Sequence, residues 1–131
     1  MKIRRVVPNI RSTRPAESRD FYVNLLGFEV VMDMGWIVTF ASPDNPTAQV
    51  SVVRHDEASH VFPDLTVEVG DVDAVHATAV ARRAQIVYAL TDEPWGVRRF
   101  CVADPNGRIV NVMSHRPAGV ETGQGDGACS R

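Results

Sequence analysis

The chain of 131 residues lacks the features that mark several large classes of protein. Its two cysteines, Cys101 and Cys129, are too few for a disulfide framework, so a reducing cytoplasm is the expected compartment. No stretch approaches the roughly 18 apolar residues of a membrane helix. Pro8 and Asn9 interrupt the apolar start well short of a secretory signal. A net charge of -2 offers no basic surface to a nucleic acid. We therefore expect a cytoplasmic protein that binds neither nucleic acid nor a membrane.

What the chain has is an order of strands and helices that occurs twice. Runs rich in β-branched and aromatic residues predict strands, and apolar residues at helical spacing predict one helix in each half. The first half has predicted strands at residues 4–10, 28–34, 36–41 and 48–53, with a helix that begins near Pro15 and ends at Gly27. The second half has predicted strands at residues 64–69, 85–90, 98–103 and 108–114, with a helix at 72–80 that Asp71 caps.

A shift of 60 positions superimposes similar residues of the two halves. The superimposed pairs include Phe40 and Phe100, Val50 and Val110, Ser51 and Asn111, and Val52 and Val112. Such a repeat predicts an α+β fold in which two βαβββ modules, about residues 3–54 and 64–115, form one domain over residues 1–115. The glycine-rich remainder, residues 116–131, is predicted to be a flexible tail.

Alternation within the strands predicts an apolar face under the helices and a mixed face opposite. The mixed face receives Val7, Asn9, Gln49, Ser51, Asp64, Thr66, Glu68, Asn111 and Met113. Two modules side by side would form a curved sheet whose mixed face bounds a cleft. Because ligand pockets are largely apolar with a few placed polar groups, this face favours a small-molecule site. A solvated sheet face is the alternative.

Short motifs in a fixed order resemble those of the vicinal oxygen chelate superfamily. They are Phe21-Tyr22 followed by Leu26-Gly27-Phe28, and Pro94-Trp95-Gly96 leading into Asp104-Pro105-Asn106-Gly107. This superfamily includes glyoxalase I, extradiol dioxygenases and bleomycin-resistance proteins. The resemblance implies paired modules, a cupped mixed sheet with helices on its outer face, and a homodimer that often completes the pocket.

The resemblance also implies where a metal ion would be held. The corresponding positions here are Val7, Ser51, Asp64 and Asn111. Val7 cannot ligate, Ser51 and Asn111 are poor ligands, and a shifted register would add only Glu68. A catalytic transition metal usually needs about three protein ligands. The chain is thus most similar to the metal-free bleomycin-resistance branch and is expected to need no cofactor, with one divalent metal ion as the alternative.

Two tryptophans occur at equivalent turns of the repeat, Trp36 in the first module and Trp95 in the second. They would either fill the core or stack on a planar ligand, with Phe40 and Phe100 nearby. Charged residues would orient a polar ligand, among them Arg98, Arg99, Asp64 and Glu68. The candidate ligand-binding residues are Trp36, Phe40, Ser51, Asp64, Thr66, Glu68, Trp95, Arg98, Phe100, Asn111 and Met113.

Two other features of the sequence are weaker candidates for a functional site. His55 and His60 are five residues apart in a predicted loop, whereas the zincin pattern needs a spacing of four on a helix. Cys101 has no neighbouring base and is interpreted as a small core residue.

Three functions remain open at this point. The first is a metal-independent binding protein, a homodimer that sequesters an antibiotic or another planar metabolite. The second is a lyase, isomerase or dioxygenase of the same superfamily, in which a divalent ion holds two vicinal oxygens. The third is metal-free acid–base catalysis by Asp64 or Glu68, with a pKa raised by burial in the cleft.

Overall fold

A computed structural model describes residues 2–55 and 59–116 of the chain. The predicted tail beyond Arg116 lies outside this range, as does the middle of the loop between His55 and His60. Among the described residues, no helix is long and apolar enough to cross a membrane.

Each half of the chain forms the predicted βαβββ unit. The first module contains β1 (Ile3–Arg11), α1 (Pro15–Arg19), the π-helical η1 (Asp20–Leu25), β2 (Glu29–Asp33), β3 (Ile37–Ala41) and β4 (Gln49–Val53). The second contains β5 (Leu65–Val69), α2 (Val72–Ala81), β6 (Gln85–Asp92), β7 (Val97–Ala103) and β8 (Ile109–His115). The α+β fold class predicted from the repeat is confirmed.

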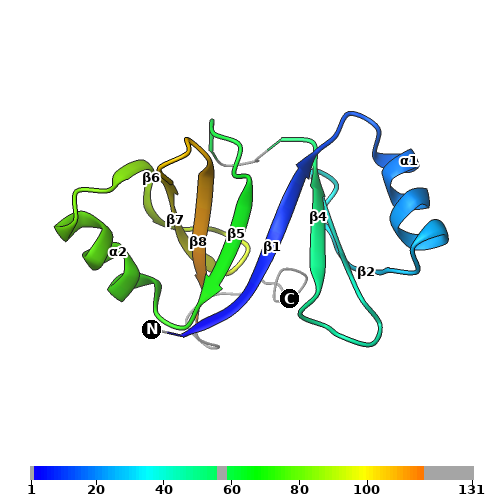
Figure 1. The fold of residues 1–131 in the computed structure, drawn as a ribbon, viewed down its shortest axis with the longest axis horizontal. Coiled ribbons are helices and arrows are strands. Elements are labelled where there is room, and N and C mark those ends of the chain that lie inside the picture. Colours follow the sequence, from blue (N-terminus) through cyan, green and yellow to red (C-terminus); the bar gives the residue numbers. More distant parts are fainter. Residues whose placement is uncertain (1, 56–58, 117–131) are drawn as a thin grey trace.

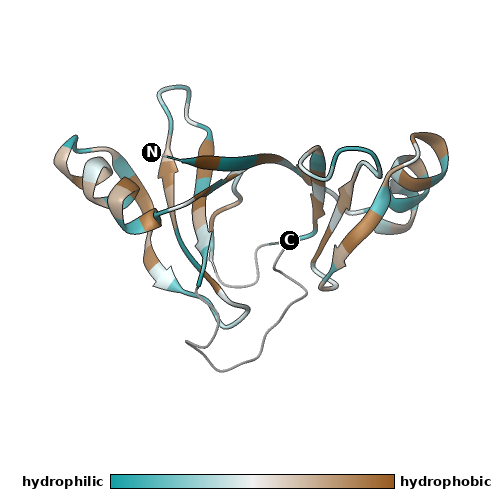
Figure 2. Cartoon of the chain, turned by 90° about the horizontal axis from the view of Figure 1, so that it is seen from below, coloured by the Kyte–Doolittle hydropathy of each residue, from teal (hydrophilic) through white to brown (hydrophobic). Residues whose placement is uncertain are grey.

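The eight strands form one mixed sheet in the order β2-β3-β4-β1-β5-β8-β7-β6. The modules join where β1 pairs antiparallel with β5, with Val7 opposite Thr66. On either side of this central pair, β1 runs parallel to β4 and β5 runs parallel to β8. The helices lie at the two ends of the sheet, and the sheet curves away from them into a cup (Figures 1 and 2).

Local capping explains where α2 and the last hairpin begin and end. Asp71 caps α2 as predicted, because its carboxylate accepts a hydrogen bond from the Ala74 N–H at 3.1 Å. In the hairpin between β7 and β8, the Asp104 carboxylate accepts hydrogen bonds from the N–H groups of Asn106 and Arg108. Gly107 closes this turn with a φ of 82°, a left-handed conformation that glycine adopts without strain.

The first helix differs from the regular α-helix that the sequence predicts. After Arg19 it widens into a π-helical turn, in which the Leu26 N–H bonds to the Phe21 carbonyl, five residues back, at 3.1 Å. In this turn Phe21 and Leu26 are 46% and 53% exposed. Tyr22 packs against the core in their place.

Each module has its own hydrophobic core between its helix and the sheet. In the first module Phe40, Val50 and Val52 form the buried cluster, and in the second Val69, Val72, Phe100 and Val112 do so. The helices do not cover the middle of the sheet. Val6 and Ile10, which alternate with Val7 and Asn9 of the mixed face, are therefore 47% and 43% exposed on the other face of β1.

Phe40 and Phe100 are corrections to the predicted ligand site. Both lie on the helix-covered face, with exposed fractions of 1% and 0%. Phe100 is opposite Val112 on the neighbouring strand, and cross-strand partners share one face of a sheet. Both rings therefore belong to the module cores and do not reach the cup.

Candidate ligand-binding site

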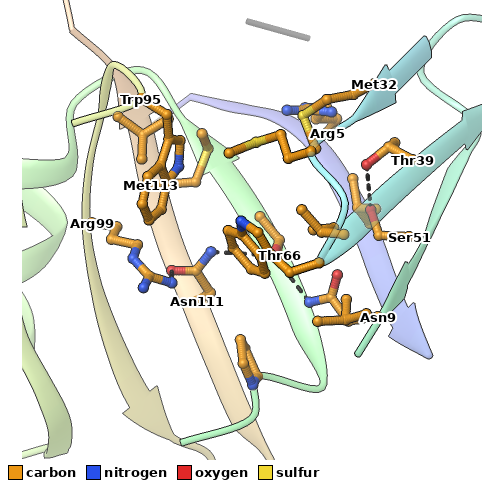
Figure 3. A pocket seen from close by; sticks show the side chains of 17 residues that line it. Arg5, Asn9, Met32, Thr39, Ser51, Thr66, Trp95, Arg99, Asn111 and Met113 are labelled. Atoms are coloured by element: carbon orange, nitrogen blue, oxygen red, sulfur yellow. Dashed lines mark hydrogen bonds between the residues drawn. The ribbon is translucent and has the colours of Figure 1, made fainter. Parts of the chain in front are cut away.

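The inner face of the cup carries a cavity of about 750 Å³, including the part open to solvent. Both modules contribute to its wall (Figure 3). The lining residues are Arg5, Val7, Asn9, Met32, Met34, Trp36, Ile37, Thr39, Ser51, Val53, Pro63, Thr66, Trp95, Val97, Arg99, Asn111 and Met113. Its lining is largely apolar with a few placed polar groups, which is the character of a small-molecule site.

A row of polar side chains crosses the floor of the cavity. The Asn9 amide donates to the Thr66 hydroxyl at 3.1 Å, and the Asn111 amide donates to the same hydroxyl at 3.2 Å. Arg99 donates to the Asn111 carbonyl oxygen at 3.5 Å. These side chains come from four adjacent strands, β1, β5, β8 and β7, whose register brings them into one line (Figure 3).

Arg99 is held by a buried carboxylate that lies behind the wall. Its Nε donates to Glu93 at 2.7 Å, and both residues are 3% exposed. The Tyr88 hydroxyl also donates to Glu93 at 2.7 Å, and burial together with this bond raises the pKa of Tyr88. The guanidinium further lies over the rings of Tyr88 and Trp95, at 4.8 and 5.7 Å from their centroids. The cation therefore has a fixed position at the cavity surface.

The two tryptophans meet across the cup. Trp36 lies at the β2–β3 turn and Trp95 at the β6–β7 turn, and their ring centroids are 5.6 Å apart at an interplanar angle of 65°. A flat ring inserted between them would need about 7 Å, twice the contact distance of carbon atoms. A planar ligand would therefore lie against one side of this pair unless the rings separate.

The rest of the wall is apolar and adaptable. Met32 and Met34 come from the first module and Met113 from the second, and Ile37 and Val97 complete this side. Methionine side chains are unbranched and polarisable, so they adjust to ligands of different outline.

A second ion-pair cluster joins the modules at one end of the floor. The Arg5 Nε donates to Glu68 at 2.6 Å, and Arg5 also donates to Gln49. The other Glu68 oxygen lies 2.9 Å from the Nδ1 atom of His115. Burial raises the pKa of Glu68, but the hydrogen bonds and charges of His115 and Arg5 outweigh it and hold this pKa at about 2. The predicted upward shift is wrong for Glu68, and a carboxylate with so low a pKa is a poor base near neutrality.

The Glu68 cluster makes stability depend on pH in a definite direction. Because the folded-state pKa lies below the usual 4.5, the stabilisation is fully present above about pH 4.5 and is lost as the pH falls toward 2. Glu68→Gln is expected to lower the free energy of unfolding by about 2 kcal/mol at pH 7, because partial exposure to solvent screens part of the interaction. In urea unfolding, the difference from wild type should shrink steadily between pH 5 and pH 2.

The matched control for that variant is Glu17→Gln. Glu17 pairs with Arg14 on the exposed surface, and such pairs contribute less than about 1 kcal/mol. A loss that is equal for Glu17→Gln and Glu68→Gln, or one that does not change with pH, would contradict the role of the Glu68 cluster.

A family model described as the Glyoxalase/Bleomycin resistance protein/Dioxygenase superfamily matches residues 2–112. The chain belongs to this superfamily. The predicted membership is confirmed, whereas the assignment to its metal-free branch stays a prediction. No curated protein sequence matches the chain.

Solved structures share the fold of this superfamily member. One is a superfamily member from Vibrio splendidus 12B01, with a TM-score of 0.64 and 20% identity over 86% of this chain and 98% of that one. The Mn(II)-bound glyoxalase from Novosphingobium aromaticivorans has a TM-score of 0.58 and 20% identity, over 95% of this chain and 42% of that one. An extradiol ring-cleaving dioxygenase from B.fuscum has a TM-score of 0.60 and 16% identity, over 89% and 33%. At these identities the likeness establishes the fold alone.

Three of the four positions at which the resemblance implies metal ligands lie in this cavity. Val7, Ser51 and Asn111 line it, and Thr66 lies beside them where Asp64 had been expected. Their donors are two hydroxyls and one amide, each already in a hydrogen bond. Within residues 2–55 and 59–116, no three His, Cys, Asp or Glu side chains lie close enough to hold a metal ion. This set of neutral donors fits a divalent transition metal poorly.

The structure brings six of the predicted ligand-binding residues into the cavity wall. They are Trp36, Ser51, Thr66, Trp95, Asn111 and Met113. Their part in binding stays a prediction, but their convergence comes from strand alternation and from the equivalent turns of the two modules.

Three charged residues predicted for the site lie elsewhere. Asp64 precedes β5, and its carboxylate accepts a hydrogen bond from the Ile109 N–H at 2.8 Å at the rim. Arg98 lies on the helix side of β7, where it pairs with Asp73 and Asp92 at 2.9 and 3.1 Å. Glu68 is close to the floor but is occupied by Arg5 and His115 and does not line the cavity.

Several lining residues were not on the predicted list, above all Arg5. Arg99 was also not on that list, although it was expected to orient a polar ligand. Alternation along β7 contains the signal for Arg99, because Val97 and Arg99 share one face while Arg98 and Phe100 share the other. The contribution of Arg5, Met32 and Met34 depends on how the central and edge strands curve, which no local pattern specifies.

Proposed function

We propose that this superfamily member is a metal-independent binding protein that sequesters a planar small molecule, such as an antibiotic, in the cytoplasm. The observation that carries the proposal is the cavity itself, in which two tryptophans and three methionines face a row of hydrogen-bond donors. Aromatic and methionine side chains supply the apolar contact that a flat ring needs, and the polar row supplies orientation.

A metal-dependent lyase, isomerase or dioxygenase is the second candidate. Its support is structural likeness, since the neighbours include a Mn(II)-bound glyoxalase and an extradiol dioxygenase. The neutral donors of Ser51, Thr66 and Asn111, and the apolar side chain at Val7, count against it. A homodimer also stays a prediction. One chain by itself supplies the lining residues given above, so the proposal does not depend on a second copy.

Thermal unfolding separates the two functions. The protein is treated with chelator and then given nickel, zinc, manganese, iron(II) or the planar antibiotic doxorubicin, each in a concentration series up to about 1 mM. A specific ligand at a hundred times its dissociation constant stabilises the fold by about 2.7 kcal/mol, a shift on the order of 5–15 °C. We expect a shift with doxorubicin and none with any ion.

Tryptophan fluorescence gives an independent measurement in the same samples. The chain has two tryptophans, and both line the cavity, so their emission should be quenched when a ligand enters. A shift with one ion that chelator reverses would contradict metal independence. If doxorubicin causes neither a thermal shift nor quenching, that result would contradict sequestration of this class of molecule.

A further inference from the structure

The Glu93–Arg99 pair, at one end of the polar row on the cavity floor, determines which groups of the row donate and which accept hydrogen bonds. Glu93 is buried and ionically paired with Arg99, so the guanidinium has a fixed orientation. Arginine has donors only, and it therefore requires the carbonyl oxygen of Asn111 to face it. The NH₂ group of Asn111 must then point the other way, toward Thr66.

Because the Asn111 NH₂ group donates toward Thr66, the Thr66 hydroxyl is left as a hydrogen-bond donor. The Thr66 oxygen accepts from Asn111, and also from Asn9, which occupies both of its lone pairs. Its own proton remains for a third partner on the cavity side. Turning the Asn9 amide end for end would let Thr66 donate to Asn9, and the Asn9 NH₂ group would then be the donor that faces the cavity. In both arrangements the floor offers a proton to a ligand.

The opposite module offers a second donor. The hydroxyls of Thr39 and Ser51 are 2.7 Å apart, so one donates to the other and one proton is left over. Both side chains line the cavity (Figure 3). The Thr39–Ser51 pair can therefore donate to a ligand or accept from one, whereas the lone pairs of Thr66 are already occupied and its hydroxyl can only donate.

The charged side chains at the cavity also favour a ligand that accepts hydrogen bonds. Arg5 and Arg99 line it, whereas their carboxylate partners Glu68 and Glu93 lie behind the wall. Among the described residues that line the cavity, none is acidic. The edge of a ligand that faces the floor therefore meets guanidinium groups and hydroxyl protons before it meets any carboxylate, which favours oxygens and disfavours a cationic group on that edge.

We propose that the cavity binds flat aromatic molecules that carry carbonyl or carboxylate oxygens on one edge, and that it rejects those that carry an ammonium group there. The oxygens face the Thr66 hydroxyl and its neighbours, and the ring lies against the tryptophan and methionine side. This inference rests on the proposed function and narrows its ligand class.

Three naphthalenes with one ring system and different edges test the inference. They are 2-naphthoate, the neutral 2-acetonaphthone, and protonated 2-(aminomethyl)naphthalene, each titrated into the full chain by calorimetry at pH 7. We expect the two acceptor-bearing compounds to bind at least tenfold more tightly than the ammonium compound. An ammonium compound that binds as tightly as 2-naphthoate would overturn the inference.

Thr66→Val is the matched variant, because it removes the hydroxyl and keeps the shape of the side chain. We expect the preference for 2-naphthoate to fall to less than about threefold. Thr78→Val, on the exposed face of α2, is the control and should leave the preference unchanged. If Thr66→Val and Asn9→Leu both keep the full preference, neither arrangement of the floor supplies the donor and the inference fails.

The result is distinguishable from a failure of the proposed function. Equal binding of all three naphthalenes would overturn the acceptor preference while sequestration of flat molecules stands. No binding of any naphthalene would overturn the ligand class, and the separate doxorubicin titration then decides whether sequestration itself fails.

Discussion

Replacing Arg99 by Met should lower the free energy of unfolding by about 3–5 kcal/mol, the largest effect that we expect from a change in the cavity wall. The change leaves the Glu93 carboxylate buried at 3% exposure without its ion-pair partner. Tyr88 would still donate a hydrogen bond to Glu93, but a neutral hydroxyl does not replace a full charge. Urea unfolding at pH 7 measures the loss.

The neighbouring arginine provides the control for this experiment. Arg98→Met removes the same charge from a partly exposed cluster with Asp73 and Asp92, and should cost less than about 1 kcal/mol. The double variant Arg99→Met/Glu93→Gln removes both buried charges and should recover most of the lost stability. Equal losses for Arg98→Met and Arg99→Met would show that the buried pair has no special weight.

The Arg99 pair also shows what the sequence could not specify. Alternation assigns Arg99 to the inner face of β7, but it does not reveal that Glu93, in the turn before β7, reaches back to the guanidinium. In the same way, the pKa of Glu68 depends on Arg5 and His115, which are 63 and 47 residues away in the chain. The sequence predicted a raised pKa for Glu68 because only its burial in the expected cleft could be inferred, and these distant partners could not.

Features that follow a repeating pattern in the sequence were predictable. The period of two in the strands placed Ser51, Thr66 and Asn111 on one face, and the 60-residue repeat placed the two tryptophans at equivalent turns. The prediction failed for Phe100 because the ring was placed near the tryptophans without assigning it to a face of its strand. The hairpin register, which pairs Phe100 with Val112, carried the better signal, since Val112 lies between Asn111 and Met113 of the mixed face and therefore points to the opposite face.

Phe100→Ala should lower the free energy of unfolding by about 3–5 kcal/mol, because it leaves a cavity in a core that cannot collapse freely. The ring is fully buried among Val69, Val72 and Val112, and the edge of His76 meets it at 5.0 Å. Guanidinium unfolding gives the value. A loss below about 1 kcal/mol would contradict the assignment of Phe100 to the core of the second module.

Because so large a loss could prevent folding, Phe100→Leu provides the companion measurement, with an expected loss of about 1–2 kcal/mol. Its dissociation constant for doxorubicin should equal that of the wild type. A tenfold higher dissociation constant would indicate that Phe100 contributes to the ligand site. Phe40→Leu makes the same change in the first module, and the two buried clusters share no residue. The losses in the double variant should therefore add to within about 0.5 kcal/mol. Additivity would mean that each helix stabilises its own half of the cup, while the ligand site depends on the strands where the halves meet.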